Sequence, residues 1–235
     1  MTALTVHRVG TERTPVLVVD RPGEADAALR AAGLGARYGQ IGSPHFPGVR
    51  AEAPRAYAEQ LARGLGPALA QAMGWGDAQL TVEASYFSIV TTPPGDLTLF
   101  QRVPHTDGLD EARVAVMHYL SSEDGGTAFF RHRTTGFERV TPDRHAGYDR
   151  QLRTDLAEHG EPQGYRRGSD AVFEEIFRVS AAPGRLAVYT GSLLHSGLVP
   201  DGPLPADPAR GRLTVNTFLL RRGGEGGWAP SGGPS

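Results

Sequence analysis

Short apolar segments separated by turn residues fill the chain from residue 79 onward, and this pattern most constrains the fold. The segments are rich in β-branched and aromatic residues, which favour strands. The chain also contains 31 glycines and 18 prolines, residues that are common where a chain turns. Strands are predicted at 79–92, 97–103, 112–120, 126–133, 184–191 and 211–221. Several short strands at this spacing indicate a mainly β domain with flanking helices (α+β), and we predict a jelly roll.

The first 78 residues differ from this pattern and are predicted to form an α/β scaffold. Residues 14–20 read as a strand, and residues 23–33 as a short helix that ends at a glycine. Residues 53–74 carry apolar side chains at helical spacing. Pro67 and two nearby glycines are expected to kink or split that helix.

The length of 235 residues fits a single domain, with residues 79–221 as its catalytic core. Residues 134–180 interrupt the strand pattern with mixed, charged sequence. We therefore expect an insertion between two core strands, placed as a lid over an active site. The glycine-rich residues 222–235 are expected to form a flexible tail.

The composition excludes several kinds of chemistry. The chain has no cysteine, which excludes thiolate nucleophiles, iron–sulfur clusters and disulfides. All 24 basic residues are arginines, so a lysine Schiff base and a Walker lysine are excluded as well. Histidine, carboxylate and arginine chemistry remains.

Charge and hydropathy indicate the setting of the protein. A formal net charge of −2 does not favour a nucleic-acid partner. The apolar runs are too short to span a membrane, and the N-terminus lacks the pattern of a signal peptide. We expect a cytoplasmic enzyme or binding protein, monomeric or homodimeric, that takes a small-molecule substrate.

His105 and Asp107 form an H-x-D pair directly after a strand-like segment. Residues two apart on a strand point to the same face, so both side chains are expected to share one face. His195, at the exit of the predicted strand 184–191, is the candidate third ligand. Two histidines and one carboxylate leave open positions on a bound iron. A structural interpretation stays open, with His105 in a turn and His195 half-buried.

A second pair, His159 and Glu161, has similar spacing but lies within the irregular residues 134–180. No predicted strand fixes these two side chains on one face. We expect a solvated loop at this point.

Four segments in chain order carry a resemblance to a known family: "RVPHTD" (102–107), "VMHYLSSEDGGTAFF" (116–130), "GRLAVYTGSLLHSG" (184–197) and "GRLTVNTFLL" (211–220). Together they resemble the iron(II)/2-oxoglutarate-dependent dioxygenases, in particular the prolyl-hydroxylase-like branch. The segment "SPHFPGVRAEAP" is similar to bacterial members that act on small molecules. The resemblance implies a double-stranded β-helix, a jelly-roll form, and an iron(II) triad of His105, Asp107 and His195.

Arg212 is the predicted anchor of the cosubstrate. The distal carboxylate of 2-oxoglutarate would be costly to bury unpaired, and a guanidinium offers it a two-pronged donor. Thr214 shares the face of Arg212 by the two-residue period. The resemblance adds Tyr119 as a further contact for this carboxylate. Arg212 as a surface residue, with Arg210 as the anchor instead, remains an alternative.

The resemblance implies that O2 and 2-oxoglutarate are consumed while a substrate C–H bond is oxidised. Hydroxylation is the default, with desaturation or ring closure as alternatives. Related halogenases have a small residue in place of Asp107, so halogenation is not expected. The arginine- and alanine-rich composition suggests a role in bacterial natural-product biosynthesis, on an amino acid or a derivative.

Candidate substrate-binding residues are Tyr86, Arg131 and Arg133. The two arginines share a face by alternation and could bind a substrate carboxylate, although solvated surface charge is the alternative. Tyr86 lies on one face of the predicted strand 79–92, and the pattern does not say which face lines the site. Two other functions stay open: a non-catalytic jelly-roll binding module, and a cupin-like metal enzyme that does not use 2-oxoglutarate.

Overall fold

The computed structural model describes residues 3–20, 24–76, 79–121 and 125–222. The strands are β1 (Ala3–Val9), β2 (Thr14–Asp20), β3 (Gly48–Glu52), β4 (Gln79–Val90), β5 (Arg113–Tyr119), β6 (Gly126–His132), β7 (Phe173–Ser180), β8 (Arg185–Thr190), β9 (His195–Leu198) and β10 (Leu213–Arg222). The α-helices are α1 (Glu24–Leu34), α2 (Arg55–Met73), α3 (Leu99–Arg102) and α4 (Pro142–His159). A short 3-10 turn spans Pro94–Asp96.

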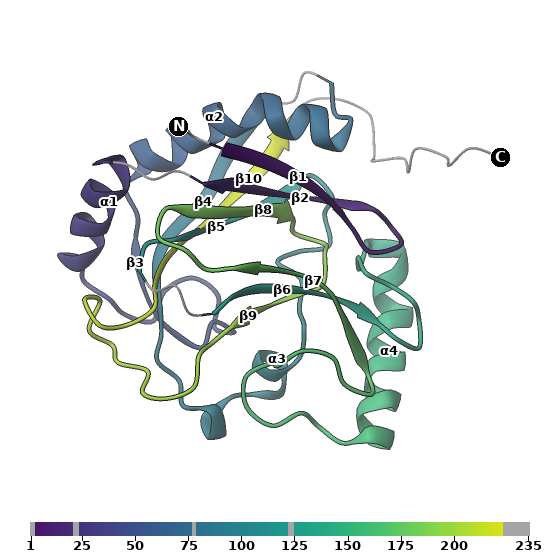
Figure 1. Cartoon of the computed structure of the whole chain (residues 1–235). Coiled ribbons are helices and arrows are strands. Elements are labelled where there is room, and N and C mark those ends of the chain that lie inside the picture. Colours follow the sequence, from purple (N-terminus) through teal and green to yellow (C-terminus); the bar gives the residue numbers. More distant parts are fainter. Residues whose placement is uncertain (1–2, 21–23, 77–78, 122–124, 223–235) are drawn as a thin grey trace.

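The strands form two antiparallel sheets (Figure 1). The larger sheet has the order β1-β2-β8-β5-β10-β4-β3, and the smaller has the order β7-β6-β9. An isolated bridge between His105 and His195 adds a fourth segment beside β9. The chain passes from β4 to the His105 segment and back to β5, then from β6 and β7 to β8, β9 and β10. This alternation between facing sheets is that of a double-stranded β-helix, so the predicted jelly roll is confirmed.

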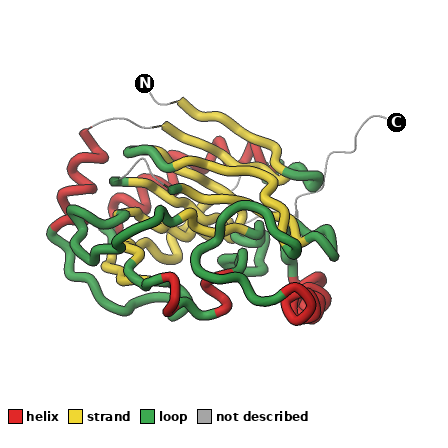
Figure 2. The backbone as a smooth tube through the Cα atoms, turned by 60° about the horizontal axis from the view of Figure 1, so that its bottom comes forward, coloured by secondary structure: helices red, strands yellow, loops and turns green. Residues whose placement is uncertain are grey.

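Side-chain alternation along the strands divides the apolar core into layers. Between the sheets, residues such as Ala115, Tyr119 and Phe129 pack together. On the outer face of the larger sheet, α2 packs on the alternate residues, including Val114 and Val116. Helix α4 covers the smaller sheet in the same way. In Figure 2 the strands lie at the centre and the helices at the periphery.

Helix α2 is continuous, contrary to the predicted kink or split at Pro67. It begins after Pro54 and ends at Gly74, whose φ of 68° is the left-handed conformation that glycine adopts readily. Burial of one face against the larger sheet outweighs the cost of an internal proline. No helix in the described part of the chain is long and apolar enough to cross a membrane.

The predicted strand at 97–103 is wrong, because the structure has the short helix α3 there. Thr98 and Gln101 form a capping box, in which each side chain satisfies the other residue's backbone N–H. The T-x-x-Q spacing is a helix-start signal, and it outweighs the strand preference of the neighbouring apolar residues.

Residues 134–180 contain more than the predicted insertion. Helix α4 and strand β7 both lie there, and β7 pairs along its length with β6. Strands β1, β3 and β9 were not predicted either; β3 and β9 have only five and four residues. The predicted flexible tail lies outside the described residues, apart from Arg222.

Leu69 tests the packing of α2 on the larger sheet. Its side chain is 0% exposed within the cluster formed by α2 and the sheet. Leu69→Ala should therefore lower the free energy of unfolding by about 2–5 kcal/mol in urea denaturation. The control Leu4→Ala, at a residue 44% exposed on β1, should change it by less than about 0.5 kcal/mol. Equal effects would contradict this packing.

Candidate metal centre

The backbone fixes His105 opposite His195. The N–H of each residue donates to the carbonyl of the other, with both N···O distances at 2.9 Å. The Asp107 N–H donates to the carbonyl of Gly191 at 2.8 Å. Segments far apart in sequence are thereby held at one edge of the smaller sheet. Their side chains have little freedom to separate.

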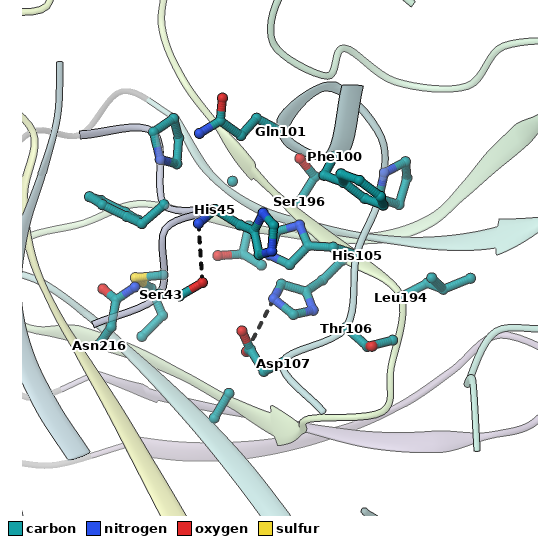
Figure 3. A pocket seen from close by; sticks show the side chains of 18 of the residues that line it. Ser43, His45, Phe100, Gln101, His105, Thr106, Asp107, Leu194, Ser196 and Asn216 are labelled. Atoms are coloured by element: carbon teal, nitrogen blue, oxygen red, sulfur yellow. Dashed lines mark hydrogen bonds and ion pairs between the residues drawn. The ribbon is translucent and has the colours of Figure 1, made fainter. Parts of the chain in front are cut away.

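The three predicted ligands meet in space, and Figure 3 shows two of them, His105 and Asp107, in the cavity. Their ligand atoms all lie within 4.8 Å of one another. The Asp107 Oδ2 atom is 3.3 Å from His195 Nε2, and the two imidazole ring centres are 4.5 Å apart. Among the described residues, this is the group of histidine and carboxylate side chains close enough to hold a metal ion.

Hydrogen bonds behind the ligands set their orientation. His195 Nδ1 donates to the carbonyl of Leu193 at 2.9 Å, which leaves Nε2, on the side of Asp107, as the nitrogen that a metal could bind. Such outer contacts fix the tautomer and ring position of metal-binding histidines.

Arg113 helps to hold the backbone of Asp107 in place. Its guanidinium donates to the Asp107 backbone carbonyl, and it also forms a two-pronged pair with Glu83. The charge of Arg113 is thus balanced by Glu83, while the Asp107 carboxylate is left for another cation.

The ligand pKa values move in different directions. Crowding by protein and the nearby His195 lower the pKa of His105 to about 4, although its surface is exposed toward the open side. Burial opposes a charge on His195, but the Asp107 carboxylate outweighs it and raises the pKa of His195. Burial would raise the pKa of Asp107, yet His195 and His105 together lower it.

The donor set fits a divalent first-row metal. Two imidazole nitrogens and one carboxylate on one side are the ligands of non-haem iron(II) oxygenases, with the remaining positions open. The open side here is a cavity of about 750 Å³, whose wall includes all three residues. A metal bound at this point would therefore be accessible to small molecules.

Arg212 lies in the wall of the same cavity. Its side chain is buried, with the residue 9% exposed. One Nη2–H donates to the carbonyl of Gly126 at 3.1 Å, while Nε has no partner among the described residues. No carboxylate of the described chain pairs with this guanidinium. Burial accordingly lowers the pKa of Arg212, although nearby tyrosines raise it.

Two further predicted contacts lie beside Arg212. The Tyr119 ring centre is 5.7 Å from the Arg212 Cζ atom, and the Tyr119 hydroxyl is 2.7 Å from Thr127 Oγ1. Thr214 lines the cavity on the same face as Arg212, as the two-residue period predicts. Its hydroxyl contacts Asn216 Oδ1 at 3.1 Å. Arg210, the alternative anchor, is exposed and is not part of the described wall.

The candidate substrate residues separate into two groups. Tyr86 lines the cavity, so its face of β4 points inward. Arg131 and Arg133 do not line it. Arg131 pairs with Glu138 at 2.6 Å and Glu174 at 2.9 Å. Both arginines therefore lie outside the described cavity wall, and their substrate role stays a prediction.

The rival pair His159 and Glu161 lies at the end of α4 and in the loop beyond it. Both residues are exposed, and neither belongs to the metal-type cluster of the described residues. Arg133, the second candidate substrate arginine, donates from Nε to the backbone carbonyl of Asp170 at 2.8 Å.

Sequence reasoning missed several residues of the cavity wall. They come from the segment before β4, from α3 and from α4: His45, Phe46, Arg50, Phe100, Gln101 and Tyr148. His45, Phe100 and Gln101 surround the opening near His105 (Figure 3). The only signal for His45, Phe46 and Arg50 was the segment "SPHFPGVRAEAP", which carries no recognisable ligand spacing, and the residues of α3 and α4 had no signal at all.

Removal of one ligand should abolish metal binding without unfolding the protein. We expect His105→Ala and Asp107→Ala to weaken iron(II) binding by more than about 100-fold, since even outer contacts contribute 10- to 100-fold. Calorimetric titration measures the affinity, and a thermal melt checks the fold. His159→Ala, at the exposed rival pair, is the matched control and should bind like the wild type. Unchanged iron(II) binding by Asp107→Ala would contradict the assignment of the three residues as metal ligands.

Metal affinity should fall as the solution becomes acidic. Binding needs a neutral imidazole, and the raised pKa of His195 lets a proton compete already near neutral pH. His105, with a pKa of about 4, contributes no such competition there. Below the pKa of His195 the apparent affinity should drop about tenfold per pH unit. A pH-independent affinity across that range would contradict the pairing of His195 with Asp107.

Comparisons with solved structures show three similar proteins at low identity. HygX from Streptomyces hygroscopicus, solved with nickel and 2-oxoglutarate bound, is 16% identical, with a TM-score of 0.46 over 88% of this chain and 83% of that one. SnoN, a non-heme alpha-ketoglutarate-dependent epimerase from nogalamycin biosynthesis, is 11% identical, with a TM-score of 0.48 over 88% and 78%. AviO1 from Streptomyces viridochromogenes Tue57 is 12% identical, with a TM-score of 0.46 over 96% and 92%.

The prolyl-hydroxylase-like branch stays a prediction. No curated protein matches the chain significantly. A family model does match, over residues 1–219, and it describes a family of unknown function, DUF6445. The chain belongs to the DUF6445 family.

Proposed function

We propose that this protein is a non-haem iron(II)/2-oxoglutarate-dependent oxygenase that oxidises an unactivated C–H bond of a small metabolite. One observation carries the proposal. The cluster of His105, Asp107 and His195 lines the same cavity as Arg212, a buried arginine with no carboxylate partner among the described residues. The first feature fits a metal with open positions, and the second fits an anionic cosubstrate.

His105, Asp107 and His195 would hold the iron(II). Their backbone and outer hydrogen bonds keep the donor atoms together before a metal arrives, which lowers the cost of ordering them. When bound, iron(II) with O2 and 2-oxoglutarate supplies the oxidant for the C–H bond, and the cosubstrate becomes succinate and carbon dioxide.

Arg212 would bind the distal carboxylate of 2-oxoglutarate. A buried guanidinium without a carboxylate partner is costly, and a bound dicarboxylate would supply the missing charge in a two-pronged contact. Tyr119 and Thr214 lie beside Arg212 and would orient the same group. The buried tyrosine would also keep water away from that ion pair.

Helix α4 and the residues around it would enclose the substrate. His145, Tyr148 and Leu152 of α4 line the cavity, so this part of the predicted insertion would form a wall of the site. An enclosed site strengthens electrostatic contacts and protects a reactive centre from water. We assign hydroxylation as the default outcome, on an amino acid or derivative in natural-product biosynthesis. Desaturation and ring closure would use the same residues.

The competing functions explain the cluster but not the arginine. A non-catalytic binding module, or a cupin-like enzyme without 2-oxoglutarate, would leave Arg212 buried with no anion to balance it. The cavity wall therefore favours the 2-oxoglutarate-dependent reaction.

Arg212→Ala tests this assignment. Loss of a desolvated charge pair costs about 2–5 kcal/mol, so the affinity for 2-oxoglutarate should fall by about 30-fold or more. Calorimetric titration of the metal-loaded protein measures it. Arg212→Lys should recover part of the loss, because an ammonium group cannot make the two-pronged contact.

The control is Arg210→Ala, two residues away and exposed. It should bind 2-oxoglutarate like the wild type, and iron(II) affinity should be unchanged in all three variants. If Arg210→Ala loses affinity and Arg212→Ala does not, the anchor is misassigned. If neither variant changes it, the 2-oxoglutarate-dependent function itself is contradicted.

A further inference from the structure

A second buried arginine lines the cavity and has no assigned role. Arg50, on β3, is 6% exposed and forms part of the wall. Its Nε atom is buried without a hydrogen-bond partner among the described residues. No described carboxylate lies within ion-pair distance of its guanidinium, and the carboxylate whose charge acts on it, Asp107, is a proposed metal ligand. A charged side chain in this condition is costly unless something else neutralises it.

The fold holds Arg50 in place from several sides. Its backbone pairs with Ser88 of β4, and on the other edge it exchanges two hydrogen bonds of 2.9 Å with Gly39. The guanidinium carbon lies 4.1 Å from the Phe46 ring centre and 5.3 Å from that of Tyr86. Two aromatic faces therefore fix the plane of the guanidinium, while its edge N–H groups remain for hydrogen bonds.

Gly42 shows how closely the loop before β3 fits this group. Its φ is 75°, and a Cβ atom there would lie 3.0 Å from Arg50 Nη1 and 3.4 Å from the Tyr86 ring. Both the backbone conformation and the space favour glycine at this point. The loop thus closes over the guanidinium without supplying a counter-charge.

The charges of the cavity wall can be paired one by one. Three arginines line the described wall: Arg50, Arg113 and Arg212. Arg113 is balanced by Glu83. The other wall carboxylates are Asp107, which is a proposed metal ligand, and Asp149, which pairs with Arg153 at 3.1 Å.

Arg50 and Arg212 therefore remain as separate anion sites. Arg50 lies on β3 and Arg212 directly before β10, with β4 between the two strands, so their backbones are separated by more than two strand spacings, on the order of 10 Å or more. A 2-oxoglutarate bound to Arg212 through its distal carboxylate would still leave the charge of Arg50 without a bound anion.

We propose that Arg50 binds a carboxylate of the primary substrate, which makes that substrate a carboxylic acid. One guanidinium fork matches one carboxylate in charge and in geometry. The assignment replaces Arg131 and Arg133 as the substrate anchor, and it rests on the proposed function. It places the substrate carboxylate at Arg50, next to Tyr86 and Phe46, beside the cosubstrate.

The test compares N-acetylglycine with its neutral amide, N-acetylglycinamide, by calorimetric titration of the metal-free protein. Wild type should prefer the carboxylate by at least about tenfold. Arg50→Gln should weaken carboxylate binding by about 30-fold or more and remove this preference. Arg50→Lys, which keeps the charge and much of the packing, should retain part of it.

Two controls separate this site from others. Arg212→Gln should keep the preference for the carboxylate, while Arg50→Gln should keep the affinity of the metal-loaded protein for 2-oxoglutarate. Arg166→Gln changes another buried arginine, which pairs with Asp170 outside the described cavity wall. It should leave both affinities unchanged.

The inference is overturned if wild type binds the amide as well as the carboxylate, or if Arg50→Gln retains the preference. It is also overturned if Arg50→Gln loses 2-oxoglutarate instead, because Arg50 would then be the cosubstrate anchor. Failure of the proposed function has a different signature. In that case wild type would not bind 2-oxoglutarate, whereas an Arg50-dependent preference for the carboxylate would still be measured.

Discussion

The site depends on one pair of backbone hydrogen bonds, those that join His105 to His195. They attach the segment after α3 to β9, and so extend the smaller sheet with the strand-like stretch that a double-stranded β-helix requires. Because Asp107 follows two residues later and is held by Gly191, the same contact places its carboxylate against both rings. The metal-type cluster is therefore a consequence of sheet pairing, and the outer hydrogen bonds only orient side chains that the backbone has already brought together.

The charges around that cluster form the second constraint. Burying an arginine without an acid is unfavourable, yet Arg50 and Arg212 are both buried in the wall of one cavity. In contrast, Arg131 is fully engaged with Glu138 and Glu174. Two uncompensated cations in one cavity fit a protein that binds two anions at once. This agrees with a cosubstrate and a substrate that each carry a carboxylate.

The sequence predicted the residues whose position follows from local rules. His105 with Asp107, and Arg212 with Thr214, were paired by the two-residue period of strands. His195 was predicted at the exit of the strand 184–191, and in the structure it begins β9. Arg50 could not be found in this way, because it is one of many arginines and β3 has no clear strand pattern. The substrate role predicted for Arg131 did not allow for partners that come from distant segments. Helix α3 replaced a predicted strand because a capping box outweighed apolar content.

Anaerobic titration of the metal-free protein with iron(II) and then 2-oxoglutarate tests the central claim most directly. A 2-oxoglutarate that chelates iron(II) on the histidine–carboxylate triad gives a weak visible metal-to-ligand charge-transfer band. We predict that this band appears only when both components are present, and that it is absent in Asp107→Ala. A wild-type protein that shows no band under saturating conditions would contradict the assignment of the cavity as an iron(II)/2-oxoglutarate site.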